Sequence, residues 1–335
     1  MSNPVLVELM RGPLVESSHC GALAVVDAGG KTVLALGDVE RPVFPRSAVK
    51  ALQALALVES GAAERYGLGD EELAVACASH GGEPGHIATV GRMLERAGLE
   101  ASALCCGAHW PLHQPSAQAL ARNGSAASAL HNNCSGKHAG FLCVAGAIGV
   151  QHRNYVEPSH PVQQVVRATL AEMTGANLER PAVDGCSVPT WAMSLRALAL
   201  GFARFGTGQG LSSARAQAAA RLREACVAKP WHVAGTGRFC TELMQGLGAR
   251  AFVKTGAEGM FCGALPEQGL GFAIKCDDGA GRAAEVVAAG LVARFGKWSG
   301  SEQILLERFI RPTLRNWNGI VVGGLRPGAA LGPRG

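Results

Sequence analysis

The sequence lacks the features that mark several classes of protein. No uninterrupted apolar run reaches about 18 residues, the length that predicts a membrane-spanning helix. The first segment, MSNPVLVELMRGPLVE, has no charged region followed by an apolar one, so we expect no signal peptide. Despite a formal charge of +5, no basic run interleaved with aromatic residues is present. These absences predict a cytoplasmic protein that binds neither membrane nor nucleic acid.

Paired-cysteine patterns are also missing, although the chain has 11 cysteines. Their number is odd and their spacing irregular, which does not fit a disulfide framework in a chain of 335 residues. Charged residues make up 17% and hydrophobic residues 48%, values that are typical of a packed globular protein. We therefore expect an enzyme of the reducing cytoplasm with buried free thiols.

Lysine is scarce, since only seven of the 31 basic residues are lysines. An ammonium group can lose its proton when it is buried, whereas a guanidinium group effectively cannot. The seven lysines are therefore worth examining as positions where arginine would not serve, although their scarcity alone identifies no site. They are Lys31, Lys50, Lys137, Lys229, Lys254, Lys275 and Lys297.

The pattern along the chain predicts strands at both ends and helices between them. Residues 3–38 alternate short β-like runs with turns, including a hairpin turn at 27–31. From about 45 to 245 apolar residues recur with helical spacing, and near 250 three short strands are predicted. Helices follow at 282–296 and around 302–309, and we expect the Gly/Pro-rich tail after 323 to be frayed.

The economical architecture for this pattern is an α+β fold. It has one discontinuous antiparallel sheet, flanked by the C-terminal helices, with a helical lobe beside it. We predict a single catalytic domain, 1–335, that consists of a sheet lobe, 1–44 plus 245–335, and a helical lobe, 45–244. The active site is expected in the crevice between the two lobes.

Ser47 and Lys50 form an S-x-x-K motif at the start of a predicted helix, FPRSAVKALQALALV. Residues three apart share a helix face, so a desolvated Lys50 amine could accept the proton of Ser47 and make it a nucleophile. The alternative is an N-cap serine followed by a solvated lysine, because so short a motif also occurs by chance.

A second motif, K-T-G at Lys254, Thr255 and Gly256, follows at the end of a predicted strand. In enzymes with S-x-x-K, this motif is a strand edge that faces the serine. The pair of motifs favours a catalytic site over an ordinary strand-ending turn. S-x-x-K and K-T-G belong to the motif set of penicillin-binding proteins and β-lactamases, whose third motif, S-D-N, is absent here. The segment LHNNCSGKHAG, residues 130–140, stands in its place. The alternative is that this segment is the cap of a helix over 136–148.

Two further segments carry reactive side chains. ELAVACASHGGEPGH, 72–86, reads as a strand-like run into a turn that bears Ser79, with a surface turn as the alternative. VDGCSVPTWA, 183–192, contributes Asp184 and Cys186 in a polar loop. Cys134, His131, His138 and Cys186 are ligand types that zinc prefers, although their spacing alone favours buried thiols over a metal site.

The segments PRSAVKALQ, ASHGG, HNNCSGKHAGF, DGCSVP and KTGAEG together resemble the class 3 L-asparaginases, the asparaginase II family. The resemblance covers nearly the whole chain and implies a fold similar to serine β-lactamases and glutaminases. It implies two Ser–Lys tandems, Ser47 with Lys50 and Ser79 with Lys254. It also implies a homodimer, Asp184 and His138 near the substrate, and a zinc site of Cys134, Lys137 and Cys186, where spacing alone would have favoured His138 or His131 over Lys137.

These observations predict an amidohydrolase that converts L-asparagine to L-aspartate and ammonia through an acyl-enzyme on Ser47. Arg46 or the segment 255–259, which includes Thr255 and Gly256, is expected to engage the substrate carboxylate. The alternatives are glutaminase, or another amide hydrolase of the same scaffold such as a penicillin-recognising enzyme, and a non-catalytic zinc-binding module. The absence of S-D-N favours asparagine over penicillin as substrate.

Overall fold

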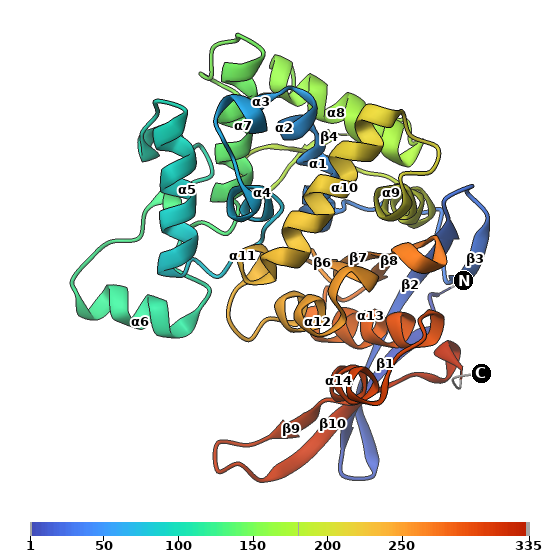
Figure 1. Cartoon of the computed structure of the whole chain (residues 1–335). Coiled ribbons are helices and arrows are strands. Elements are labelled where there is room, and N and C mark those ends of the chain that lie inside the picture. The colour runs from blue at the N-terminus through green and yellow to red at the C-terminus, as the bar shows by residue number, and fades with distance from the viewer. Residues whose placement is uncertain (1, 180, 333–335) are drawn as a thin grey trace.

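A computed structural model describes residues 2–179 and 181–332 of the chain. Its main feature is an eight-stranded antiparallel sheet in the order β6-β7-β8-β2-β1-β10-β9, with β3 paired to β2 (Figure 1). The strands of this sheet are β1 (Val5–Arg11), β2 (Leu14–Asp27), β3 (Thr32–Leu36), β6 (Phe252–Thr255), β7 (Met260–Leu265), β8 (Leu270–Cys276), β9 (Thr313–Arg315) and β10 (Val321–Pro327). The strands come from both ends of the sequence, which confirms the predicted discontinuous antiparallel sheet and the α+β class.

The long strand β2 joins the two parts of the sheet. Its first half pairs with β1, and its second half pairs with β8 on one edge and β3 on the other. The predicted hairpin at 27–31 is present, because the Asp27 carboxylate accepts hydrogen bonds from the main-chain N–H groups of Gly29 and Lys31.

The expectation of a frayed tail after 323 is wrong for residues 324–327, and its last part, 333–335, lies outside the described residues. Strand β10 lies inside the sheet and pairs with both β1 and β9. Gly323 permits this pairing, because a Cβ there would approach the Met10 carbonyl oxygen to 2.0 Å. A glycine-rich segment can therefore be a paired strand where two backbones approach closely.

Helices make up most of the rest of the described chain and lie on both faces of the sheet (Figure 1). The longer ones are α4 (Asp70–Ala76), α5 (Pro84–Arg96), α6 (Gln114–Arg122), α7 (Ser135–Ala147), α8 (Pro161–Thr174), α9 (Leu195–Thr207), α10 (Ser213–Ala228), α12 (Phe239–Leu247), α13 (Gly281–Phe295) and α14 (Gly300–Ile310). The short ones are α1 (Lys50–Gln53), α2 (Leu55–Glu59), α3 (Ala62–Arg65) and α11 (Pro230–Ala234), and a small hairpin of β4 (Pro181–Val183) and β5 (Pro189–Trp191) lies among them. Within the described residues, none of these helices combines the length and the apolar character needed to cross a membrane.

Aromatic packing shows which side chains lie on which face of the sheet. Phe252 of β6 packs against Phe202 and Phe205 of α9, with ring centroids 6.2 and 5.1 Å apart. Phe261 of β7 packs against Phe239 of α12 at 5.3 Å. Because residues two apart on a strand share a face, Lys254 lies on the same face as Phe252, towards the helical lobe.

The segment before Ser79 differs from its prediction. Residues 70–76 form helix α4, not a strand-like run. Acidic residues in the first turn favour this helix, and the Glu72 carboxylate accepts a hydrogen bond from the free N–H of Gly69 at 3.1 Å. An apolar run of this length does not by itself distinguish a buried strand from a buried helix.

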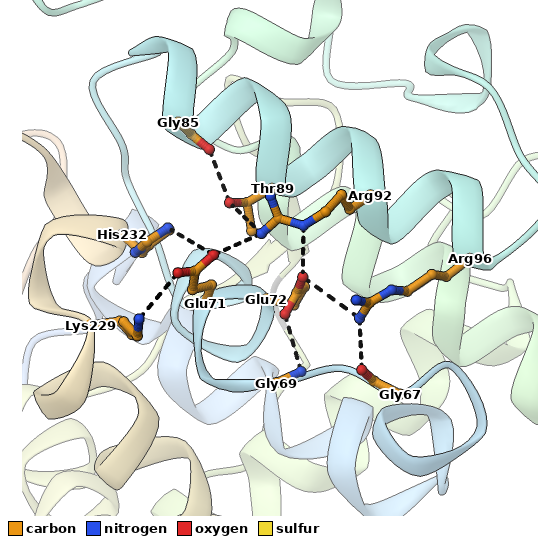
Figure 2. Close-up of polar contacts among 10 residues, drawn as sticks. All are labelled: Gly67, Gly69, Glu71, Glu72, Gly85, Thr89, Arg92, Arg96, Lys229 and His232. Carbon is orange, nitrogen blue, oxygen red and sulfur yellow. Dashed lines mark hydrogen bonds and ion pairs between the residues drawn. The ribbon is translucent and has the colours of Figure 1, made fainter.

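Ion pairs fix α4 to two neighbouring helices (Figure 2). Arg92 of α5 contacts Glu71 at 2.8 Å and Glu72 at 3.2 Å. Glu71 also contacts Lys229, the residue before α11, at 3.1 Å. Helix α4 ends at Ala76, shortly before Ser79, so this network helps to hold the start of the Ser79 loop in place.

Candidate active site

Ser47 lies in a short 3-10 helix, η1 (Arg46–Val49), that continues into α1. Its side chain is half-buried, and Arg46 before it adopts a left-handed conformation with φ +50°. A Cβ on Gly256 would come within 3.0 Å of Pro45 O and of Ala48 N, so the K-T-G strand packs directly on this turn. The structure therefore brings the two predicted motifs side by side.

Lys50 is completely buried and connects three segments of the helical lobe. Its Nζ atom donates to Ala78 O at 2.7 Å, Cys134 Sγ at 3.0 Å, Ser79 Oγ at 3.1 Å and Asn133 O at 3.3 Å. Within the described residues, no side-chain hydrogen bond joins Lys50 to Ser47. Lys50 was predicted to pair with Ser47, but it donates instead to Ser79, the serine predicted to pair with Lys254.

Lys254 is also completely buried, and its Nζ atom donates to Thr255 O at 2.8 Å. Burial, reinforced by the nearby positive charge of Lys50, lowers the pKa of Lys254 to about 7. An amine with this pKa is about half neutral at pH 7 and has a lone pair to accept a proton. No side-chain hydrogen bond within the described residues joins Lys254 to Ser79, its predicted partner.

The loop that carries Ser79 is fixed by groups that the sequence did not single out. Ser79 N donates to Val233 O at 3.0 Å. The next residue, His80, accepts a hydrogen bond at Nδ1 from Gly82 N and contacts Ser135 Oγ through Nε2 at 2.9 Å. Burial keeps the pKa of His80 well below the usual range, so its ring is neutral and carries its proton on Nε2.

A second buried histidine continues this arrangement. His86 stacks on His80 with centroids 4.8 Å apart, and on Trp231 at 3.9 Å. Its Nδ1 accepts from Glu83 N at 3.3 Å, and its Nε2 contacts Trp231 O at 3.0 Å. Burial lowers the pKa of His86 to about 4. The sequence shows the two histidines together in ASHGGEPGH. It does not show that Trp231, which is distant in sequence, packs against them.

Two predicted substrate residues bind each other. Arg46 Nε donates to Asp184 Oδ1 at 2.6 Å, and Gly185 N donates to the same oxygen at 2.9 Å. Burial by itself would raise the pKa of Asp184, but the charges of Lys137 and Arg46 lower it below the usual value. Asp184 is therefore an ionised carboxylate paired with Arg46.

Cys134, Lys137 and Cys186 converge, as the resemblance implied. Lys137 Nζ donates to Cys186 Sγ at 3.0 Å. A hydrogen bond from the Cys186 thiol lowers the pKa of Cys134 well below its usual value and raises that of Cys186. Burial opposes protonation of Lys137, but the sulfur atoms and Asp184 outweigh it and raise its pKa.

The donor atoms of this set are two sulfurs and one nitrogen, which are types that zinc accepts. Lys137 would have to lose its proton before it could bind a metal, so binding would depend on pH. In the part of the chain that the structure describes, no group of three or more His, Cys, Asp or Glu side chains could hold a metal ion. The predicted zinc ligands do not form such a group, because only two of them are cysteines and the third is Lys137.

His138, also predicted near the substrate, lies next to this set on α7 and is completely buried. Its Nδ1 lies 2.6 Å from the hydroxyl oxygen of Tyr155. Thr255 is half-buried at the end of β6, and its hydroxyl donates a long hydrogen bond, 3.5 Å, to Gly256 O. The predicted site residues lie in η1, α1, the Ser79 loop, the 184–187 loop and β6, at the start of α7 and at its N-cap Cys134, and at Gly256 just after β6.

The sequence matches the family described as L-asparaginase II over residues 7–327. The chain belongs to the L-asparaginase II family. Membership confirms the resemblance drawn from the five motifs and indicates an amidohydrolase of the asparaginase type. No curated protein sequence matches the chain.

Solved structures similar to this asparaginase II family member include a beta-lactamase from Mycobacterium bovis, at 17% identity and a TM-score of 0.41. That alignment covers 86% of this chain and 94% of the other. A structure described as Mglu aligns at 13% identity with a TM-score of 0.39, covering 84% of this chain and 68% of that one.

Proposed function

We propose that this protein hydrolyses L-asparagine to L-aspartate and ammonia through an acyl-enzyme. The observation that carries the proposal is the packing of the K-T-G strand on the turn that bears Ser47, with a buried Lys254 whose pKa is lowered to about 7. An active-site base needs a pKa near the working pH, and a buried lysine beside another positive charge meets that requirement.

Ser47 is the proposed nucleophile. Its oxygen attacks the side-chain amide carbon of asparagine, and its proton passes to the neutral amine of the lysine pair. The sequence assigned this step to Lys50, but the Nζ atom of Lys50 contacts Ala78 O, Asn133 O, Ser79 Oγ and Cys134 Sγ, and it forms no hydrogen bond with Ser47 among the described residues. We therefore propose Lys254 as the resting base, with Lys50 orienting Ser79.

Ser79 and the two lysines form the proposed proton relay. When the tetrahedral intermediate collapses, the relay returns the proton to the departing nitrogen, and ammonia leaves. A water molecule then attacks the ester on Ser47, and the same relay takes its proton. As the bond from Ser47 Oγ to the acyl carbon breaks, the relay returns the proton to Oγ and L-aspartate leaves. The N–H of Ser47, at the start of a helical turn, is the proposed donor to the oxyanion.

Arg46 is the proposed partner of the substrate carboxylate. Asp184 engages its Nε, which leaves the Nη groups to form charge-assisted hydrogen bonds with an anion. Thr255 and Gly256 line the same turn from the strand side and are proposed to complete this subsite, with His138 and Asp184 behind it.

Cys134, Lys137 and Cys186 are the proposed holders of one zinc ion. Bound there, zinc would fix the start of α7 to the 184–187 loop and add positive charge beside the substrate. Elemental analysis of the purified protein tests the site. One zinc per chain, lost in Cys134→Ser but kept in the exposed Cys105→Ser, is expected. Equal zinc in both variants would contradict the assignment.

A substrate panel tests the function itself. We expect ammonia release from L-asparagine at a kcat/KM at least tenfold above that for L-glutamine, and no hydrolysis of penicillin. Preference for glutamine would place the protein among the glutaminases. An absence of turnover with every amide, in a folded and zinc-loaded protein, would support the non-catalytic zinc-binding module. A homodimer in a reducing cytoplasm is part of the proposal, and the 11 free cysteines are consistent with that compartment.

A further inference from the structure

Glu83 is a buried carboxylate to which the proposed reaction gives no role. It lies at the N-cap of α5, four residues after Ser79, and is only 5% exposed. Both of its oxygens are engaged by one residue of another segment. Oε1 accepts a hydrogen bond from the main-chain N–H of Thr236 at 2.8 Å, and Oε2 accepts one from the Thr236 hydroxyl at 2.7 Å.

Thr236 is fixed in turn by Trp231. The indole N–H of Trp231 donates to the Thr236 hydroxyl at 2.9 Å, and since an indole N–H can only donate, the hydroxyl hydrogen is left for Glu83. The backbone comes close to the carboxylate here. A Cβ on Gly235 would lie 2.4 Å from Glu83 Oε1, and the φ of Gly235, +113°, favours glycine. The segment 231–236 therefore folds around the Glu83 carboxylate.

The same segment holds the main chain of Ser79. Val233 belongs to α11, and its carbonyl oxygen accepts a hydrogen bond from Ser79 N at 3.0 Å. The last carbonyl groups of a helix have no partner inside it, so Val233 O in this five-residue helix is available to another segment. The loop 79–83 thus binds the segment 231–236 at both of its ends, through Ser79 and through Glu83.

The middle of the loop 79–83 is closed from the other side. Gly81 O accepts a hydrogen bond from His113 N at 2.9 Å, and a Cβ on Gly82 would lie 2.8 Å from His131 O. His113 Nδ1 also lies 3.7 Å from Glu83 Oε2. The loop is therefore packed between two parts of the chain, and the Glu83 carboxylate is the charged group that ties it to the segment 231–236.

We propose that Glu83 is a positioning residue that keeps Ser79 in place for the proton relay of the proposed reaction. Ser79 Oγ accepts a hydrogen bond from Lys50 Nζ at 3.1 Å, and this contact requires the loop to stay against α11. Without the carboxylate, the end of α11 loses an anchor and Val233 O can move away from Ser79. A displacement of about 1 Å can lower a reaction rate by about 10²-fold. The effect on the reaction rests on the proposed function, but the anchoring of the loop does not.

Amide hydrogen exchange of the full-length protein, measured by mass spectrometry, tests the anchoring. Peptides that cover 77–83 and 231–236 should exchange about tenfold faster in Glu83→Ala than in the wild type, because hydrogen bonds to a charged group are lost. Thr236→Val, which loses only the hydroxyl, should change both peptides in the same direction by less. Thr236→Ser keeps the hydroxyl and should exchange as the wild type does.

Thr207→Val is the matched control. The Thr207 hydroxyl, at the end of α9, also donates one hydrogen bond and accepts another, and its loss should leave both peptides unchanged. Unchanged exchange in a folded Glu83→Ala would overturn the anchoring role. If Glu83→Ala does not fold, the comparison of Thr236→Val with Thr236→Ser decides, and equal exchange in these two variants would overturn it.

Steady-state kinetics with L-asparagine test the role of Glu83 in the reaction. The proposed carboxylate subsite, formed by Arg46, Thr255 and Gly256, lies on other elements. Glu83→Ala should therefore lower kcat by about tenfold or more and leave KM within about twofold. A raised KM with unchanged kcat, or faster exchange with unchanged kcat, would overturn the positioning role. If the wild type releases no ammonia, the proposed function fails together with this catalytic role, whereas the exchange measurement still decides whether Glu83 anchors the loop.

Discussion

Lys254 combines complete burial with a neighbouring positive charge, and both effects favour its neutral form. Below pH 7 it becomes protonated and can no longer accept a proton, so activity should fall about tenfold per pH unit on the acid side. Lys254→Met should lower kcat by about 10²–10⁴-fold. The measurement is the pH dependence of kcat/KM for asparagine.

The control for this prediction is Lys275→Met. Lys275 lies on the adjacent part of the sheet, and its amine donates to the Glu258 and Cys276 carbonyl oxygens. This variant should keep the acid limb near pH 7. A wild-type profile that is flat from pH 5 to 8 would show that Lys254 is not the base.

His86 should reduce stability in mild acid. Its pKa is about 4 in the folded protein and about 6.5 in the unfolded chain, so between these values only the unfolded chain binds the proton. The folded state therefore loses about 1.4 kcal/mol per pH unit, or roughly 2 kcal/mol at pH 5. This penalty should be absent from His86→Phe, which keeps a ring to stack on Trp231.

Urea unfolding at pH 7 and pH 5 checks this prediction. The free energy of unfolding of the wild type, relative to that of His86→Phe, should be lower at pH 5 than at pH 7. An exposed histidine, His152, provides the control, since His152→Phe should behave as the wild type does. A pH-independent difference between wild type and His86→Phe would contradict the account.

At the level of elements, α4 and α7 approach each other so closely that only glycine fits between them. A Cβ on Gly136 would lie 2.1 Å from the Val75 carbonyl oxygen, which is backbone and cannot move aside. Gly136→Ala should destabilise the protein by about 3 kcal/mol or more. It should also disturb Ser79, because α4 precedes that residue.

Gly91 is the matched control within α5, because a Cβ there meets no atom within 4 Å. Gly91→Ala should raise stability by up to about 1 kcal/mol through its better helix propensity. Thermal unfolding of both variants measures the contrast. Equal effects of the two substitutions would contradict the close approach of α4 and α7.

The ion pairs around α4 lead to a second prediction at this level. The Glu72 side chain is only 6% exposed and contacts Gly69, Arg92 and Arg96. Glu72→Gln should cost about 1–3 kcal/mol, because the ion pairs of a buried carboxylate with Arg92 and Arg96 and its cap on Gly69 are weakened together. Glu64 pairs with Arg221 at the surface, and its side chain is 60% exposed. The substitution Glu64→Gln should therefore cost at most about 0.5 kcal/mol. Denaturant unfolding distinguishes the two, and an equal cost would show that burial does not matter here.

The sequence predicted most helices well because their apolar spacing is regular. It placed helix 136–148 within one residue of α7. It misread α4 as strand-like, because seven apolar and acidic residues do not define a period. It also missed β10, where glycine serves close strand pairing and not a turn.

At the scale of the whole molecule, the sheet joins the two ends of the chain. Strand β1 pairs with β10, β2 with β8, β8 with β7 and β7 with β6, and Gly256 just after β6 packs on the turn of Ser47 although the two segments are far apart in sequence. The S-x-x-K and K-T-G motifs could be recognised from the sequence. The hydrogen bond between Lys50 and Ser79, and the contacts of His80, His86, Trp231 and Tyr155, depend on tertiary packing that no local pattern encodes.

Ammonia release from L-asparagine by the wild type, Ser47→Ala and Ser79→Ala tests the central claim most directly. With melting temperatures unchanged, Ser47→Ala should lose about 10³-fold or more of the activity, because no nucleophile remains. Ser79→Ala should retain measurable turnover, since Ser79 only relays protons. Wild-type activity in Ser47→Ala, or activity abolished only in Ser79→Ala, would contradict the assignment of Ser47 as the nucleophile.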